Sequence, residues 1–71
     1  MTELLATIAE NLRVLRARKN IRQEDVAKGI GTTTANISRY EQGLQEPSLA
    51  TVVKLADFFD VSIDSLRYRS E

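Results

Sequence analysis

The 71-residue sequence predicts an all-α fold, a bundle of five short helices, from three observations. Apolar residues recur at intervals of three and four positions, which is the period of a helix that buries one face. Residues that end or begin helices, such as Gly31, Thr33 and Ser48, separate these apolar segments. No segment alternates between apolar and polar residues as a strand does. Because 42% of the residues are hydrophobic, enough for one small core, we expect a single domain over residues 1–71.

The first helix is expected over residues 3–18, with Thr2 as its N-cap. Arg13 and Arg16 are placed on different faces of this helix. Asn20 follows the helix because asparagine tolerates the left-handed conformation that closes one. The apolar stripe of the helix consists of Leu5, Ile8, Leu12 and Leu15.

The second and third helices are expected over residues 23–30 and 34–42, and a tight turn joins them. Gly31 supplies the positive φ that such a turn needs, and Thr33 caps the third helix through its hydroxyl. Gly29 weakens the second helix by up to ~1 kcal/mol relative to alanine. The residues of the second helix expected in the core are Val26, Ala27 and Ile30.

The third helix has an unusually low apolar content. Ile37 is its one clearly buried residue, with Tyr40 partly buried, so this helix is not stable alone and must be held by packing. Its remaining face carries short hydrogen-bonding side chains and Arg39. A polar helix held out from a domain by a glycine turn is what reading of the DNA major groove requires. We therefore expect a sequence-specific DNA-binding domain organised around residues 23–42.

Two further helices complete the predicted bundle. Gly43 ends the third helix, Ser48 caps a fourth over residues 49–59, and Ser62 caps a fifth over about residues 63–68. Their expected core residues are Leu49, Val52, Leu55, Ala56, Phe59, Ile63 and Leu66. The apolar residues expected outside the core or at its edge are Leu44, Val53, Phe58 and Tyr68.

Composition excludes several classes of protein. Without cysteine or histidine, the chain has no disulfide framework and no thiolate or imidazole metal site, so we expect no metal and no cofactor. No apolar run approaches the ~20 residues of a membrane span, and the N-terminus lacks the order of a signal peptide. The cytoplasm is therefore the expected location, with no membrane partner.

The charges are unevenly distributed although the net charge is zero. Residues 13–39 contain seven basic and two acidic side chains, a net charge of +5. The remaining residues contain three basic and eight acidic side chains, a net charge of −5. Such segregation favours one positive face toward phosphate and a negative face away from it, with chance clustering as the alternative.

A family resemblance rests on Gln23, Ala27, Gly31, Ile37, Glu41 and Gly43, followed by Pro47 and Ser48. These residues resemble the Cro/C1-type helix-turn-helix domain, also called the XRE family, over a motif at about residues 23–42. The spacing is specific: a small residue at the fifth motif position, glycine at the ninth and a branched aliphatic residue at the fifteenth. Two residues depart from the family pattern: Thr32 replaces an aliphatic residue at the tenth position, and Gly29 replaces a better helix former. The resemblance implies a five-helix, lambda-repressor-like DNA-binding fold that binds operators as two-fold dimers.

The resemblance also assigns roles to residues of the second and third helices. Arg39 suits a bidentate contact to guanine O6 and N7, worth ~1–3 kcal/mol of discrimination. Asn36 suits adenine or a phosphate, Ala35 a thymine methyl group, and Gln23 a phosphate. The alternatives are that Arg39 is an ordinary solvated arginine and that Gln23 only starts a helix. The complete set of expected DNA-binding residues is Arg22, Gln23, Lys28, Thr33, Thr34, Ala35, Asn36, Ser38 and Arg39.

Two further expectations concern an ion pair and a dimer. In the family, residues that match Arg16 and Glu41 form a largely buried ion pair, and losing one partner would cost ~3–5 kcal/mol. One module buries too little surface for tight specific binding, so we expect a homodimer on a pseudo-palindromic operator, with a monomer as the alternative. The residues expected at its interface, in the fifth helix and the adjoining loop, are Leu44, Ile63, Leu66 and Tyr68.

The leading hypothesis is a transcriptional repressor or dual regulator of phage, plasmid or restriction-modification type that binds double-stranded DNA. The alternative is a helical protein–protein interaction module that keeps the fold without binding DNA. RNA polymerase is a further candidate partner, because Glu24 and Asp25 would form an acidic patch beside promoter DNA. An enzyme is not expected, because the carboxylates are scattered and no glycine-rich loop could hold a phosphate.

Overall fold

The computed structural model describes the backbone of residues 3–68 and the side chains of residues 7–68. The Thr2 cap and the side chain of Leu5 therefore lie outside the described residues. Five helices follow one another along the chain: α1 (Glu3–Lys19), α2 (Gln23–Ile30), α3 (Thr34–Glu41), α4 (Leu49–Phe59) and α5 (Ile63–Arg67). No strand occurs within residues 3–68, and the predicted all-α, five-helix fold is confirmed.

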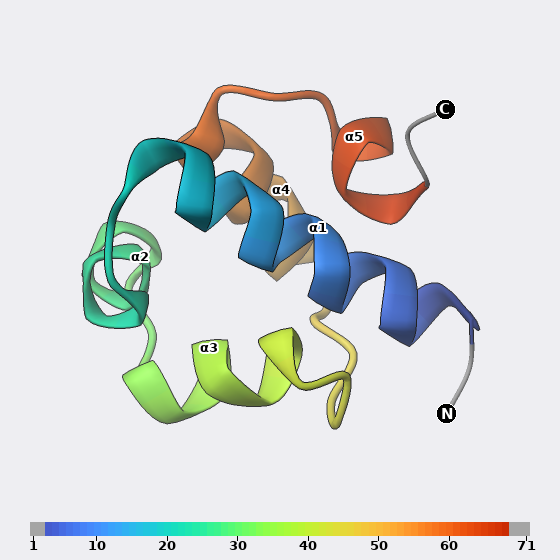
Figure 1. Cartoon of the computed structure of the whole chain (residues 1–71), viewed down its shortest axis with the longest axis horizontal. Helices are drawn as coiled ribbons and strands as arrows, with labels where there is room; N and C mark the ends of the chain where they lie inside the picture. The colour runs from blue at the N-terminus through green and yellow to red at the C-terminus, as the bar shows by residue number, and fades with distance from the viewer. Residues whose placement is uncertain (1–2, 69–71) are drawn as a thin grey trace.

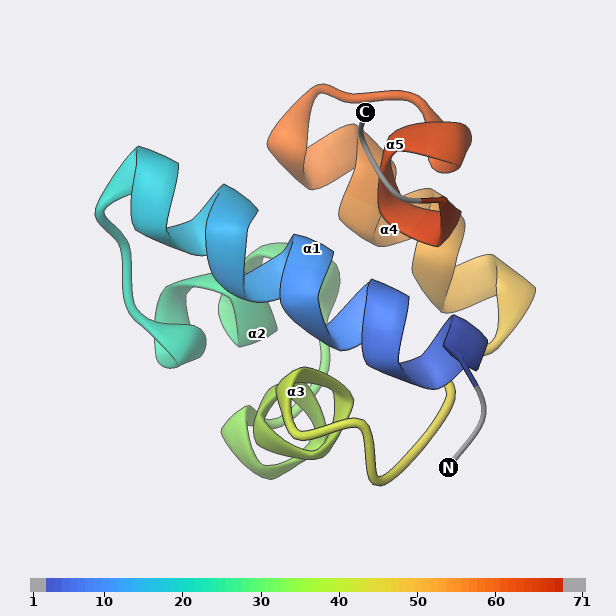
Figure 2. The ribbon, with the colours of Figure 1, turned by 45° about the vertical axis from the view of Figure 1, so that its right-hand side comes forward.

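Helix α1 crosses the middle of the molecule. It contacts α3 on one side and α5 on the other, while α2 contacts both α3 and α4 (Figures 1 and 2). The core fills the space between the helices, and α2 contributes all three residues expected of it. The buried hydrophobic residues are Ile8, Ala9, Leu12, Val26, Ala27, Ile30, Ile37, Tyr40, Val52, Leu55, Ala56, Phe59 and Leu66.

Three helices begin at residues whose side chains cap them as predicted. The hydroxyls of Thr33, Ser48 and Ser62 accept hydrogen bonds from the backbone N–H groups three residues further on, each over 3.2 Å. Each cap satisfies a helix-start N–H that would otherwise lack a partner, which is typically worth ~1 kcal/mol. Local chemistry of this kind explains why the predicted helix boundaries agree with the structure to within one residue.

The helix ends are set by residues in the left-handed region. Gly31 has φ 75° and Asn20 has φ 53°, so both predictions are confirmed. Asp60, which ends α4 with φ 56°, was not predicted to adopt this conformation. A short polar side chain such as aspartate tolerates it better than a branched one.

Two packing expectations are wrong. Leu49 was expected in the core but is 65% exposed. As the first residue of α4 it continues the apolar stripe of that helix beyond the point at which other helices cover it. Arg13 and Arg16 were expected on different faces of α1, yet both reach Glu41. Residues three apart are neighbours on a helix surface, so one residue of α3 can bind both.

Gly29 has a packing role that its low helix propensity did not reveal. A Cβ atom added at Gly29 would lie 2.1 Å from Cε1 of Phe58, far inside van der Waals contact. Phe58 is itself held edge-on against Phe59, with ring centroids 5.0 Å apart. The ring of Phe58 can therefore lie over residue 29 in this position only because residue 29 has no side chain.

Candidate nucleic-acid interface

The turn between α2 and α3 is fixed by backbone hydrogen bonds. Gly31 adopts the left-handed conformation, and the N–H of Thr32 donates to the carbonyl of Ala27 over 2.9 Å. Thr33 then accepts the N–H of Asn36 and starts α3. The direction in which α3 leaves α2 is thereby set within three residues, which is what a rigidly mounted helix requires.

One side of α3 is buried and the other is free. Ile37 and Tyr40 anchor the helix in the core, while Thr34, Ala35 and Arg39 are exposed on its outer side. In Figure 1, α3 lies at the lower edge of the molecule, on the side of α1 away from α5. No other part of the described chain covers this outer side, so it is free to enter a groove.

The polar residues on α3 are joined by hydrogen bonds to one another. Arg39 Nη1 donates to Asn36 Oδ1 over 3.0 Å, and Asn36 Nδ2 donates to Thr32 Oγ1 over 2.9 Å. Ser38 Oγ accepts from Gln42 Nε2 over 2.7 Å, so Ser38 has a partner within its own helix. Thr32, which departs from the family pattern, acts here as a hydrogen-bond acceptor, a role that the sequence did not indicate.

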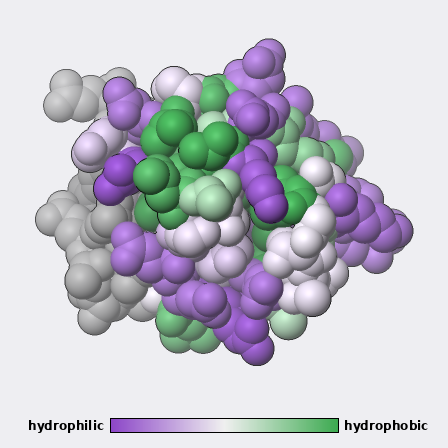
Figure 3. Space-filling model, turned by 180° about the vertical axis from the view of Figure 1, so that it is seen from behind, coloured by the Kyte–Doolittle hydropathy of each residue, from purple (hydrophilic) through white to green (hydrophobic). Residues whose placement is uncertain are grey.

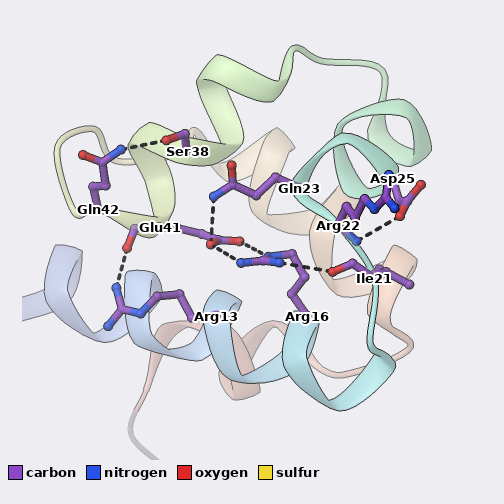
Figure 4. A network of polar contacts seen from close by, with 9 residues as sticks. All are labelled: Arg13, Arg16, Ile21, Arg22, Gln23, Asp25, Ser38, Glu41 and Gln42. Atoms are coloured by element: carbon purple, nitrogen blue, oxygen red, sulfur yellow. Dashed lines mark hydrogen bonds and ion pairs between the residues drawn. The ribbon is translucent and has the colours of Figure 1, made fainter.

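A single carboxylate joins three helices behind this surface (Figure 4). Arg16 of α1 binds Glu41 of α3 through a fork, Nε to Oε2 over 2.7 Å and Nη2 to Oε1 over 3.0 Å. Gln23 of α2 donates to the same Oε1 over 3.1 Å. Arg13 donates to the backbone carbonyl of Glu41. The expected ion pair is therefore present, as part of a larger network that holds the end of α3.

The Arg16 guanidinium is held in its charged form by this network. The hydrogen bond to Glu41 raises the pKa of Arg16 above its usual value, and this effect outweighs the opposing desolvation. Arg16 also donates to the carbonyl of Ile21 over 3.1 Å, which ties the link between α1 and α2 to the same guanidinium. Because arginine stays protonated in proteins, this guanidinium remains a cation at physiological pH.

Gln23 has a structural partner that the sequence did not indicate. One N–H of its side-chain amide is used by Glu41, so a phosphate at the start of α2 would meet the second N–H or the backbone. Arg22 and Lys28 are exposed at the two ends of α2. The structure therefore leaves Arg22 and Lys28 freer to reach a phosphate than Gln23.

The acidic residues of α2 have local partners. Asp25 accepts the backbone N–H of Arg22 over 2.9 Å, and Glu24 lies 3.4 Å from the Arg22 guanidinium. Asp25 thus caps its own helix start, and an acidic side chain there also suits the helix dipole. These contacts give both carboxylates a structural explanation that needs no protein partner.

The expected dimer interface needs one correction. Leu66 is only 1% exposed and belongs to the core of its own chain, so it cannot contact another copy. Ile63 is half-buried, whereas Leu44 and Tyr68 are 67% and 56% exposed. Asn11 of α1 donates to the carbonyls of Leu66 and Tyr68 over 2.7 and 3.1 Å, which anchors the end of α5. One signal for Asn11 is visible in the sequence, since it is a polar residue within the apolar stripe of α1.

Two features are absent from the part of the chain that the structure describes. Residues 3–68 contain no helix that is long and apolar enough to cross a membrane. The same part of the chain contains no group of three or more histidine, cysteine, aspartate or glutamate side chains placed to hold a metal ion.

A short helix, a tight glycine turn and a second helix with a free polar side define a helix-turn-helix protein. The helix-turn-helix family HTH_3 matches residues 12–66. This chain belongs to that Cro/C1-type (XRE) helix-turn-helix family. The family is one of DNA-binding transcriptional regulators and not an enzyme class.

Relatives in sequence carry the names of transcriptional regulators. The chain is 43% identical over 63 residues to the cryptic phage CTXphi transcriptional repressor RstR of Vibrio cholerae, covering 89% of this chain and 57% of RstR. It is 40% identical over 55 residues to an uncharacterised HTH-type transcriptional regulator of Methanocaldococcus jannaschii, covering 78% of this chain and 83% of that protein. The chain spans about half the length of several of the relatives that it matches.

Solved structures share the whole arrangement of helices. The restriction-modification controller protein C.AhdI of Aeromonas hydrophila superimposes with a TM-score of 0.83 at 31% identity, over 87% of this chain and 94% of that chain. The hypothetical transcription factor NHTF from Neisseria superimposes with a TM-score of 0.88 at 27% identity, over 93% of this chain and 76% of that chain.

Proposed function

We propose that this chain binds double-stranded DNA in a sequence-specific manner as a transcriptional regulator, with α3 in the major groove. We assign it to the repressor type of phage, plasmid or restriction-modification systems. Two relatives support this assignment: RstR is named a phage transcriptional repressor, and C.AhdI is named a restriction-modification controller protein. The observation that carries the proposal is the free polar side of α3, mounted on a fixed turn and held from behind by the network around Glu41.

The arrangement of charge supports this orientation. The motif exposes three basic residues, Arg22, Lys28 and Arg39, against two acidic ones, Glu24 and Asp25. The exposed acids Asp60 and Asp64 lie at the end of α4 and on α5, and α5 is on the other side of α1 from α3 (Figure 1). A positive surface around α3 and a negative one behind it would turn the correct side of the protein toward phosphate.

Individual residues take roles according to their chemistry. Arg39 reads guanine through two N–H donors, and the methyl group of Ala35 contacts a thymine methyl group. Thr33 and Thr34 contact the backbone or a base edge near the start of α3. Arg22, Lys28 and Gln23, at the ends of α2, bind flanking phosphates, which fixes register without reading sequence.

A second copy of the chain completes the proposed DNA-binding unit. Glu46 and Pro47 of the loop after α3, Leu49 of α4 and Arg67 of α5 line one surface hollow of about 260 Å³. The fifth helix and this loop are therefore neighbours, and Leu49 joins Leu44, Ile63 and Tyr68 as a candidate contact. Figure 3, the view from behind, has hydrophobic side chains gathered on the face that α4 occupies. A two-fold dimer would place its α3 helices ~34 Å apart, one turn of DNA.

The experiment that tests the proposal is selection from a pool of random duplex DNA, followed by gel shifts of the enriched duplex at several salt concentrations. We expect enrichment of a pseudo-palindrome and a shift that weakens steeply as salt is raised. A pool that stays random after repeated rounds would reject sequence-specific binding. It would favour instead a protein-interaction module on the same fold.

A further inference from the structure

A row of hydrogen bonds along the outer side of the motif joins Thr32, Asn36 and Arg39. Arg39 Nη1 lies 3.0 Å from Asn36 Oδ1, and Asn36 Nδ2 lies 2.9 Å from Thr32 Oγ1. A guanidinium only donates, so the oxygen of the Asn36 amide must face Arg39 and its nitrogen must face Thr32. The hydrogen bonds in this row therefore all point the same way: Arg39 donates to the amide of Asn36, and the amide donates to the hydroxyl of Thr32.

The backbone of Thr32, where this row of hydrogen bonds ends, is fixed by the turn. The backbone N–H of Thr32 donates to the carbonyl of Ala27 over 2.9 Å, directly after the left-handed Gly31. Thr32 thus belongs to the cap of α2 and not to α3, which begins two residues later. The position of the Thr32 hydroxyl is set by the turn, and the amide of Asn36 is oriented against it.

We propose that Thr32 and Asn36 are positioning residues that hold the Arg39 guanidinium in the orientation with which it reads guanine. The inference rests on the proposed function and deepens it. An exposed arginine has many rotamers and loses that freedom when it binds, so a side chain already held in place binds with a smaller entropic cost. One N–H of Arg39 is used by Asn36, and the others remain for O6 and N7 of the base.

This inference changes the roles of two residues. Asn36 gains a role beside any contact to adenine, because each end of its amide has a partner within the motif. Thr32, which departs from the family pattern, acts through Arg39 without touching a base. An aliphatic residue at position 32 could pack against the turn equally well but would leave the Asn36 amide without its acceptor.

The discriminating substitution is Thr32→Val, which removes the hydroxyl and keeps the shape of the side chain. Thr32→Ser keeps the hydroxyl and is the matched control. We expect Thr32→Val to lower the preference for guanine at the base pair that Arg39 contacts by about three- to tenfold, the usual effect of one hydrogen bond. Thr32→Ser should retain the wild-type preference. Binding to an unselected duplex should be the same for all three proteins.

Thr32→Val is then repeated in an Arg39→Ala background. If Thr32 acts through Arg39, the substitution has no further effect on base preference there. If Thr32 contacts DNA itself or only shapes the turn, the two losses add, and the inference is wrong. Asn36→Ala provides a second variant, with the same expected dependence on Arg39.

The assay uses duplexes selected from a random pool by the wild-type chain, with each base pair substituted in turn. A loss of guanine preference in Thr32→Val that Thr32→Ser restores supports the inference. Full preference in Thr32→Val, together with its loss in Arg39→Ala, would overturn the inference while leaving the proposed function intact. If the wild-type chain selects no sequence at all, the proposed function and the inference both fail.

Discussion

The guanidinium of Arg16 in α1 holds both carboxylate oxygens of Glu41 at the end of α3, at 2.7 and 3.0 Å. Glu41 is only 5% exposed, and Gln23 of α2 donates to the same carboxylate. One buried acid therefore connects the first helix to both helices of the motif. The angle at which α3 is presented depends on a residue that lies outside the motif itself.

Arg16→Met should destabilise the protein by ~3 kcal/mol, because it leaves the carboxylate of Glu41 buried without its cation. The measurement is the free energy of unfolding in urea. Arg18→Met, two residues away and exposed, should change it by less than ~0.5 kcal/mol. A double variant, Arg16→Met with Glu41→Leu, should recover most of the loss. Equal stability of Arg16→Met and Arg18→Met would show that the pair is not a structural link.

Gly29→Ala should destabilise the protein although alanine is the better helix former. The gain in helix propensity is up to ~1 kcal/mol, whereas forcing a methyl group against Phe58 costs ~1–3 kcal/mol. Phe58→Ala removes the ring, and in that background Gly29→Ala should become stabilising. The measurement is the free energy of unfolding in urea of the wild type, Gly29→Ala, Phe58→Ala and the double variant. It gives the sign of the Gly29→Ala effect with and without the Phe58 ring. A more stable Gly29→Ala in the wild-type background would mean that Phe58 moves aside freely.

Lys28→Ala should weaken DNA binding uniformly across sequences. Lys28 is exposed in the last turn of α2 and is proposed to bind a phosphate. Its loss should make the plot of log binding constant for DNA against log salt concentration less steep, by about 1 in slope. Fluorescence anisotropy over a range of salt gives the slope. Arg18→Ala is the control, because Arg18 lines a hollow with Val61 and Ser65 near α5, away from α3. An unchanged slope for Lys28→Ala would remove this phosphate contact.

Self-association should depend on the exposed apolar residues near α5. Leu49→Glu and Tyr68→Glu should each weaken the dimer at least tenfold without lowering stability, since both side chains are largely exposed. Ala17→Glu, at an exposed residue of α1 that does not line the hollow beside α5, is the control. Sedimentation equilibrium measures the association constant. A wild-type chain that remains monomeric at concentrations that saturate its DNA would contradict the dimer.

The fold was largely predictable because its boundaries depend on local chemistry. Caps such as Thr33 and turns such as Gly31 act on backbone groups within four residues, so the sequence shows them directly. The prediction that Leu49 is buried was wrong because periodicity assigns a face to a residue but does not indicate where the covering helix ends. The coverage of a helix end is a tertiary property.

The candidate site was predictable in its location and less so in its internal contacts. The exposed side of α3 follows from its low apolar content, but the partners of Gln23 and Thr32 depend on how rotamers meet across the turn. Gly29 shows the same limit, because its close neighbour Phe58 belongs to another helix. Helix propensity alone takes no account of this neighbour.

The free side of α3 is proposed to read DNA, and substitution of Arg39 is the sharpest test of this proposal. The measurement compares the affinity of the wild type, Arg39→Ala and Arg18→Ala for the selected duplex and for a scrambled one. Loss of a bidentate guanine contact worth ~1–3 kcal/mol should reduce the preference of Arg39→Ala for the selected duplex by about 5- to 150-fold. Arg18→Ala should keep the wild-type preference. An Arg39→Ala protein that discriminates between the two duplexes as well as Arg18→Ala would contradict the account.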